Sequence, residues 1–399
     1  MIGTVKVHLA PSNWHYKGMN LALLALCISI QTHKLMRIGC VKGLSMALRF
    51  PHISSMKGIS MKKTFLPVLA KTLLGVVLAT GLVGAFAQAK KEVTFAHQDM
   101  QLPLRVLMDA ELEKATGYKI NWRMFGGGGE VIKAMGSGDV QIGEVGSSPL
   151  ATATSQGQDL RLVYILDDIA ASDQLVSRNG AGINGWKDLV GKKVGTPFAS
   201  TAHYSLMVGM RLEGIDAKSV NVMNLPPPAI AAAWERGDID ASFIWDPVLS
   251  KIKRNGKAIA TSGDIGKKGY PTFDGLVVNA KWAAENRDFV VALIKAITKA
   301  DADYRANAAK WTVGSPQVKA IAKWTKADEK DVPDAMSAFA LPDPAAQMSN
   351  AWLGGGTAGG AAKTLENSAK LWKEIGRITD VKADYSVFID SSYLRDAMK

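Results

Sequence analysis

Apolar positions along residues 92–279 switch between two periods, one typical of strands and one typical of helices. In the first half, strand patterns at 92–97, 118–125, 140–145 and 160–166 are separated by helical patterns at 102–116, at 131–135 and after 149. Strands that alternate with helices predict a parallel α/β sheet, and ligands bind such sheets at the carboxyl ends of their strands.

Residues 126–150 are the stretch around which this half is organised. Four glycines at 126–129 precede one helical pattern, and Gly-Ser-Ser-Pro at 146–149 precedes another, with Ser147 or Ser148 expected as its cap. Helix N-termini present free N–H groups and a positive dipole end, and glycine lets the backbone approach a ligand closely. The stretch predicts an anion site, although two ordinary turns would also explain it.

The second half repeats the alternation of strands and helices. Strand patterns lie at 174–178, 192–196, 220–224, 239–245 and 273–279, and helices begin after 197–201, after 226–228 and at Asp246-Pro247. We expect the strand at 273–279 to carry the chain back to the first sheet. Helical patterns then follow at 280–307, 315–326, 331–339 and 361–376.

Residues 130–150 align with residues 229–249 when one gap is allowed. Each segment is a helix, a glycine stop, an aspartate, a strand, and then a polar residue before proline. The repeat predicts two lobes of similar topology that both offer strand ends to a ligand; chance similarity is the alternative, because Gly-Asp after a helix is common.

The formal charge of +12 does not describe the body of the chain. Residues 1–89 hold ten of the 48 Lys and Arg and none of the 36 Asp and Glu, which leaves 38 basic and 36 acidic residues from 90 onward. A nearly neutral body excludes the nucleic-acid-binding class that the overall charge would suggest.

Residues 61–89 are typical of a secretory signal peptide. Lys62 and Lys63 form a positive start, 72–87 is an uncharged and mostly apolar stretch, and Ala85-Phe86-Ala87 and Ala87-Gln88-Ala89 fit the small-x-small cleavage rule. A membrane anchor is the alternative, but the stretch is shorter than the roughly 20 residues that a span needs. Residues 1–60 are then an upstream extension that precedes the true initiator, Met61.

Both cysteines, Cys27 and Cys40, precede the expected cleavage point. The expected mature chain, residues 90–399, therefore has no disulfide, thiol nucleophile, thiolate metal site or lipid-accepting cysteine. Its length suits one large or two medium domains.

The mature chain resembles the substrate-binding proteins of bacterial ABC importers, in the family that takes sulfonates, nitrate and taurine. The residues that carry the resemblance are SGDVQIG at 137–143, GSSPL at 146–150, STAHYSL at 200–206, LPPPAIAAAWERGDIDASFIWDP at 225–247 and PTFDGLVV at 271–278. The chain departs from the family at Gly126–Gly129, where an Asp-Ser-Gly entry is usual, and at the extra acids Glu130 and Glu144.

The resemblance implies an α/β fold of the type II periplasmic-binding-protein class, with two α/β lobes joined by two crossing strands and a ligand cleft between them. Lobe 1 would comprise 90–178 and 274–399, and lobe 2 would comprise 179–273. It also implies a monomeric periplasmic solute-binding protein, without cofactor, metal or catalytic residues, that delivers taurine or a similar small sulfonate to a membrane permease.

Taurine is a zwitterion, and the resemblance implies that different loops bind its two ends. The sulfonate needs donors, for which we expect the N–H groups of Gly127, Gly128, Gly129 and Glu130 and the side chains of Ser147, Ser148, Ser200 and Thr201. The ammonium needs acceptors, for which we expect Asp274 or Asp246, with Gln98 as a neutral helper.

Each of the remaining site predictions has an ordinary structural alternative. Asp246 is also suited to cap a helix, and Asp274 to a structural pairing. Trp245 suits either the core or an apolar wall against the two-carbon linker. His203 is expected as an indirect donor rather than a metal ligand, and Glu130 as a residue that favours its helix dipole.

Three other functions remain open at the level of sequence. One is a binder of a different anion or zwitterion, such as nitrate or a longer alkanesulfonate, and another is an exported ligand sensor that docks on a membrane kinase. The third is an enzyme, because a thiamine-pyrimidine synthase with a cysteine-rich motif shares this fold. The absence of cysteine from 90–399 argues against that enzyme.

We predict that export releases a chain that begins at Gln88 or Lys90, because the cleavage motifs end there. N-terminal sequencing of the exported protein checks this prediction. An exported protein that retains residues 1–60 would contradict it.

Overall fold

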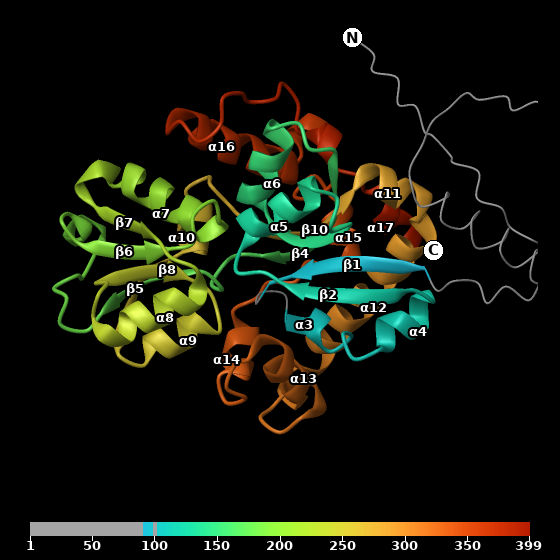
Figure 1. Cartoon of the computed structure of the whole chain (residues 1–399), viewed down its shortest axis with the longest axis horizontal. Helices are drawn as coiled ribbons and strands as arrows, with labels where there is room; N and C mark the ends of the chain where they lie inside the picture. The colour runs from blue at the N-terminus through green and yellow to red at the C-terminus, as the bar shows by residue number, and fades with distance from the viewer. Residues whose placement is uncertain (1–90, 99–101) are drawn as a thin grey trace, which may run out of the picture. The chain divides into compact units, whose positions relative to one another are not determined.

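The structure is a computed structural model that describes residues 91–98 and 102–399. The expected upstream extension at 1–60, the signal peptide at 61–89 and both cysteines lie outside the described residues. Two five-stranded sheets organise residues 91–399, each covered by helices (Figure 1). The predicted class, two α/β lobes, is confirmed.

The first sheet has the strand order β2-β1-β3-β10-β4. Its strands are β1 (Glu92–His97), β2 (Lys119–Met124), β3 (Ile142–Gly146), β4 (Leu160–Asp168) and β10 (Phe273–Asn279). Strand β1 runs parallel to β2 and β3, whereas β10 runs antiparallel to β3 and β4. The chain therefore returns to this sheet through β10, as the sequence predicts.

The second sheet has the order β7-β6-β8-β5-β9. Its strands are β5 (Gln174–Arg178), β6 (Lys193–Thr196), β7 (Asn221–Asn224), β8 (Ala241–Ile244) and β9 (Gly256–Thr261), of which β9 was not predicted. Because β5 pairs with β8 and β9, we propose that the lobes divide at 169–173 rather than after 178.

The repeat in the sequence corresponds to a repeat in the structure. Helix α5 (Gly128–Gly136), β3 and α6 (Ser147–Ser155) match helix α8 (Pro227–Arg236), β8 and α9 (Val248–Lys253). Strands β3 and β8 each take the third place in their sheets. Each repeat therefore places its strand in the middle of a sheet, and a helix follows the end of that strand.

One predicted helix is wrong. The segment 102–116 forms two short helices, α3 (Leu102–Arg105) and α4 (Glu111–Thr116), separated at Ala110, whose φ is 67°. Tertiary contacts override the local helical pattern here, because Arg105 at the end of α3 is held by a buried ion pair with Glu144.

The remaining helices follow the predicted patterns, except that α10 and α15 were not predicted and the pattern at 280–307 is divided into α11 and α12. They are α7 (Thr201–Leu212), α10 (Ser262–Gly266), α11 (Ala280–Glu285), α12 (Arg287–Asn307), α13 (Pro316–Thr325), α14 (Val332–Ser337), α15 (Pro344–Met348), α16 (Gly360–Glu374) and α17 (Ser392–Ala397). Helices α8 and α9 lie on one side of the second sheet and α7 on the other (Figure 1). Within the described ranges, no helix is long and apolar enough to cross a membrane.

Each sheet has its own hydrophobic core. In the first, strand residues such as Phe95 and Ile142 pack with helix residues such as Leu293. In the second, Phe243 packs with Leu206 and its neighbours. Two separate cores allow the two sheets to behave as separate lobes, because each buries its own apolar face.

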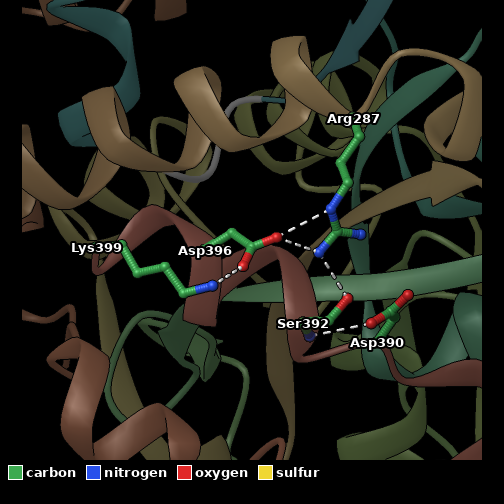
Figure 2. Close-up of polar contacts among 5 residues, drawn as sticks. All are labelled: Arg287, Asp390, Ser392, Asp396 and Lys399. Carbon is green, nitrogen blue, oxygen red and sulfur yellow. Dashed lines mark hydrogen bonds and ion pairs between the residues drawn. The ribbon is translucent and has the colours of Figure 1, made fainter.

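The C-terminal helix is fastened to the first core by a polar cluster (Figure 2). The Arg287 guanidinium donates to Asp396 Oδ2 from Nε at 3.0 Å and from Nη2 at 2.5 Å, and Nη2 also donates to Ser392 Oγ at 3.0 Å. Hydrogen bonds from Lys399 and Arg287 lower the pKa of Asp396 to about 2. The carboxylate therefore stays charged, and α17 stays attached to α12, at any ordinary pH.

A buried carboxyl on α12 generates a prediction about pH. Asp301 accepts a hydrogen bond from Tyr164 Oη at 2.9 Å, and burial raises its pKa to about 7. An unfolded aspartate has a pKa of about 4, so the folded state holds a proton that the unfolded state loses, and stability falls as pH rises from about 4 to about 7.

Asp301→Asn keeps an acceptor for Tyr164 and removes the titration. We expect it to leave stability nearly unchanged at pH 4 and to raise it at pH 8 by a few kcal/mol, since one pKa unit corresponds to about 1.4 kcal/mol. Denaturant unfolding at the two pH values measures this. The control is Asp303→Asn, an exposed position on the same helix. Equal shifts at both pH values would show that Asp301 does not titrate in this range.

Candidate functional site

Three helix N-termini meet at one point between the two sheets. A Cβ placed on Gly128 at the start of α5 would lie 2.4 Å from Pro149 Cγ in the first turn of α6. A Cβ placed on Gly146, just before α6, would lie 2.7 Å from Thr201 Cγ2 in the first turn of α7. Only glycine permits both approaches. The positive dipole ends of α5, α6 and α7 are therefore concentrated at this junction, which suits an anion.

The glycine loop also lines a pocket of about 190 Å³. Gly126, Gly127, Gly129 and Glu130 form one wall, and Pro197, Phe198, Asn224 and Pro226 form the other. Glu130 folds back on its own loop, because its Oε2 accepts a hydrogen bond from Gly126 N at 3.0 Å. That contact agrees with the ordinary interpretation of Glu130 as part of a helix start.

Ser147 and Ser148 occupy the first turn of α6, and neither caps it, because the N-cap is Gly146. The predicted cap is therefore wrong by one or two positions. Ser147 Oγ accepts from Phe273 N at 3.4 Å, and Ser148 Oγ accepts from the indole Nε1 of Trp372 at 2.9 Å. Each oxygen already accepts a bond from the protein, so each hydroxyl proton is the group that can serve an anion.

The first turn of α7 uses its two hydroxyls differently. Ser200 caps the helix, because its Oγ accepts from His203 N at 3.0 Å and donates to Pro197 O at 2.6 Å. Thr201 Oγ1 donates to Asp173 Oδ2 at 3.1 Å. These partners leave the backbone N–H groups of Thr201 and Ala202 as the donors that the first turn of α7 can offer.

His203 is an aromatic component of the junction. Its ring stacks on Phe198 at 4.4 Å and on Trp372 at 5.1 Å between centroids, and its Nδ1 accepts from Ala199 N at 3.3 Å. Burial and the nearby Arg377 lower the pKa of His203 to about 3. The imidazole is therefore neutral at ordinary pH and contributes no positive charge to an anion site.

A group of aspartates lies on the other side of Gly146. Asp274 on β10 is opposite Gly146 of β3 and opposite Asp167 of β4, and its Oδ1 would lie 3.3 Å from a Cβ on Gly146. Burial, followed by Asp274 and Asp173, raises the pKa of Asp167 well above its usual range. Burial and the neighbouring Asp246 raise the pKa of Asp173 to about 7, although its bond from Thr201 opposes the shift.

Gln98 belongs to a buried polar cluster beside these aspartates. Its backbone N–H donates to Glu144 Oε2 at 2.8 Å, and its side-chain amide donates to Glu144 O at 2.7 Å. Arg105 Nη2 donates to the same Oε2 at 2.7 Å and also to Gln98 O. Breaking a buried pair of this kind typically costs about 3–5 kcal/mol, so Glu144 and Arg105 hold Gln98 firmly. Glu144 therefore has a structural partner and is not an extra free acid.

Two predicted residues have structural partners of their own. Trp245 packs in the core of the second sheet and is only 4% exposed. Asp246 Oδ1 accepts from Ser250 N at 2.9 Å in the first turn of α9, although the N-cap position itself is Pro247. The structure thus brings together the glycines, Ser147, Ser148, Thr201 and Asp274, with Ser200 and His203 supporting them.

Sequence reasoning missed Asp167, Asp173, Arg105 and Trp372. For Asp167 a signal was available, because it closes the apolar strand LRLVYILDD at the strand's carboxyl end, where ligands bind. Trp372 carried no local signal, since it is 224 residues from the serine that it contacts.

Comparison with known proteins places this geometry in a family. The family described as NMT1/THI5 like matches residues 114–309. The taurine-binding periplasmic protein of Escherichia coli (strain K12) is 33% identical over 312 residues, which are 78% of this chain and 95% of that protein.

Solved structures with lower identity share the fold. The periplasmic aliphatic sulphonate binding protein SsuA from Escherichia coli is 20% identical with a TM-score of 0.59, and covers 73% of this chain and 94% of its own. The alkanesulfonate-binding protein SsuA from Xanthomonas axonopodis pv. citri, bound to MOPS, is 18% identical with a TM-score of 0.62, and covers 75% and 98%. With its two α/β lobes and its identity to the Escherichia coli protein over almost that protein's whole length, this chain belongs to the taurine-binding family of periplasmic substrate-binding proteins of ABC importers.

Proposed function

We propose that this protein is the periplasmic solute-binding component of an ABC importer, and that it captures taurine or a similar small sulfonate. The observation that carries the proposal is the meeting of three helix N-termini between the two sheets, at Gly128, Gly146 and Thr201. The 33% identity to a taurine-binding protein supports the same ligand class.

The sulfonate end of the ligand would be bound at this junction. The first N–H groups of α5, α6 and α7 have no carbonyl four residues back within their own helices, so they can donate to sulfonate oxygens. The exceptions are Glu130 N, which donates to Gly127 O and so does not serve as the predicted donor, and His203 N, which donates to Ser200 Oγ. Ser147 and Ser148 would add hydroxyl protons, and Trp372 orients the Ser148 hydroxyl by donating to its oxygen.

The ammonium end would be bound by Asp274. Of the two predicted partners, Asp246 is engaged with Ser250 of α9, whereas Asp274 is 3% exposed and lies beside Gly146 at the junction. Opposite ends of a zwitterion would then meet opposite charges across a single glycine.

The location and the partner of the protein are inferred from its relatives and from the expected signal peptide. Its periplasmic relatives support export, for which 61–89 would be the signal, and delivery of the ligand to a membrane permease. We propose a non-catalytic role, because the curated relatives are binding proteins and residues 90–399 contain no cysteine. The alternatives are a binder of another anion, which the experiments below address, and an exported sensor, which would bind the same ligand.

Thermal-shift screening tests the ligand class. We expect taurine or a close aminosulfonate to raise the melting temperature, because a ligand that binds only the folded state stabilises it by about 2.7 kcal/mol at a concentration of 100 Kd. Nitrate and aromatic acids serve as comparison ligands. If nitrate or an aromatic acid stabilises the protein and no sulfonate does, the ligand assignment is wrong.

Calorimetry with taurine and ethanesulfonate separates the two ends of the site. Ser148→Ala should weaken the binding of both ligands alike, by about 0.5–1.5 kcal/mol, because both carry the sulfonate. Asp274→Asn should weaken taurine by about 1.5–3 kcal/mol, the value of a charged hydrogen bond, and should change ethanesulfonate much less.

Ser155→Ala is the matched control, because Ser155 lies at the far end of α6 and is bonded to Tyr385. It should leave both affinities unchanged. If Asp274→Asn lowers the affinities for taurine and for ethanesulfonate equally, Asp274 has a structural role.

A further inference from the structure

Five buried acceptor atoms beside the junction have no hydrogen-bond donor among the described residues. They are Gln98 Oε1, Glu144 Oε1, both carboxylate oxygens of Asp167, and Asp274 Oδ1. All four side chains are 0–3% exposed. Buried polar groups are almost always hydrogen-bonded, so a group of acceptors without donors calls for a donor that is absent from the protein itself.

These atoms belong to one connected region. Gln98 donates twice to Glu144, Glu144 is close enough to Asp274 to raise its pKa, and Asp274 is opposite Asp167 in the paired strands β10 and β4. Asp173 reaches the same region through Thr201, whose Oγ1 donates to Asp173 Oδ2 at 3.1 Å and whose Cγ2 approaches Gly146, as Asp274 Oδ1 does. The missing donor therefore has to serve a single region.

The charges around Asp167 and Asp274 are predominantly negative. Asp168 and Asp173 face the pair from β4 and from the segment after it, and Glu144 faces it from β3. Asp246, after β8, adds a further acid beside Asp173. Within the described part of the chain, no lysine or arginine forms an ion pair with Asp167, Asp173 or Asp274, and Arg105 is engaged by Glu144. Two buried carboxylates this close, without a cation, do not both stay ionised.

We propose that Asp167, Asp173 and Asp274 form the cation subsite of this protein, that Asp167 and Asp274 share one proton while the subsite is empty, and that the ammonium of an aminosulfonate replaces that proton. The proposal rests on the proposed function for the class of ligand. Capture of each aminosulfonate would then release about one proton to solvent.

The charge balance of this exchange is closed. The empty pair holds two carboxyl groups and one proton, for a net charge of −1, and the occupied pair holds two carboxylates and one ammonium, also for −1. The ligand keeps its own protons, and the displaced proton goes to water. Burial and the surrounding acids raise the pKa of both Asp167 and Asp274 well above the usual range, which favours a proton in the empty site at neutral pH.

An ammonium also satisfies the geometry better than a proton does. It brings three N–H donors to a region rich in free acceptors, whereas one proton serves only one pair of oxygens. Asp173 lies between β4 and β5, and Asp274 lies on β10, so the cation would connect both segments that cross between the sheets. Asp167 and Asp173 would therefore select aminosulfonates over plain alkanesulfonates.

Calorimetry in two buffers of different ionisation enthalpy counts the protons. At pH 7 we expect about one proton released per taurine bound and none per ethanesulfonate. The affinity for taurine should fall about tenfold for each pH unit below 7 while the pair stays protonated, as linkage requires. Taurine binding that releases no proton and does not depend on pH between 5 and 7 would overturn the proposal.

Variants and a measurement on the ligand-free protein identify the groups involved. Asp167→Asn combined with Asp274→Asn should abolish the proton release, and its loss of affinity should be larger for taurine than for ethanesulfonate, which lacks the ammonium. The control is Asp168→Asn, which changes the neighbouring carboxyl on the same strand. Taurine binding to this variant should release one proton, as it does in the parent. Infrared spectra of the ligand-free parent at pH 7 should show a protonated carboxyl band that the double variant lacks.

The outcomes separate this proposal from the proposed function. If taurine binds but the ligand-free protein shows no acid band, the proposed function stands and the proposal of a shared proton is wrong. If the acid band is present but the protein binds no sulfonate, the shared proton is confirmed. The proposed function is then wrong, and so is the replacement of the proton by an ammonium. Proton release that persists in the double variant would show that other groups carry it.

Discussion

The close approach at Gly146 is the constraint on which the site depends. A single Cβ here would lie 2.7 Å from Thr201 Cγ2 on the second sheet's first helix and 3.3 Å from Asp274 Oδ1. The end of β3, the start of α6, the start of α7 and the return strand β10 can meet only because this position has no side chain. A larger residue would force Thr201 or the backbone to move at the point where ligand donors and acceptors converge.

The two sides of this glycine have opposite electrostatic character for reasons of secondary structure. On one side, helices α5, α6 and α7 direct unpaired N–H groups and positive dipole ends inward. On the other, strands β4 and β10 place Asp167 opposite Asp274, and both side chains are buried. Helix starts therefore supply donors, strand ends supply acceptors, and a small zwitterion matches both.

One set of contacts between the lobes lies next to the sulfonate side. Phe198 and His203 of the second lobe stack between Arg377, 4.5 Å from the Phe198 ring, and Trp372 of the first. Trp372 in turn donates to Ser148. An aromatic contact that joins the lobes is thus directly bonded to a hydroxyl of the site, so the approach of the lobes and the orientation of that hydroxyl are coupled. Arg211 adds an ion pair to Glu374 beside this stack.

The sequence by itself determined the features that depend on neighbouring residues. Hydrophobic periods, glycine stops and the repeat of 130–150 in 229–249 predicted the two lobes, the return of β10, and the glycine and serine helix starts, because local geometry sets these. Only the tertiary structure decided the rest. It broke the helix at 102–116 through Arg105 and Glu144, assigned Asp246 to α9, and brought Asp167 beside Asp274 and Trp372 beside Ser148. These partners are distant in sequence, and the register and packing that join them are energies of the whole fold, so no local pattern records them.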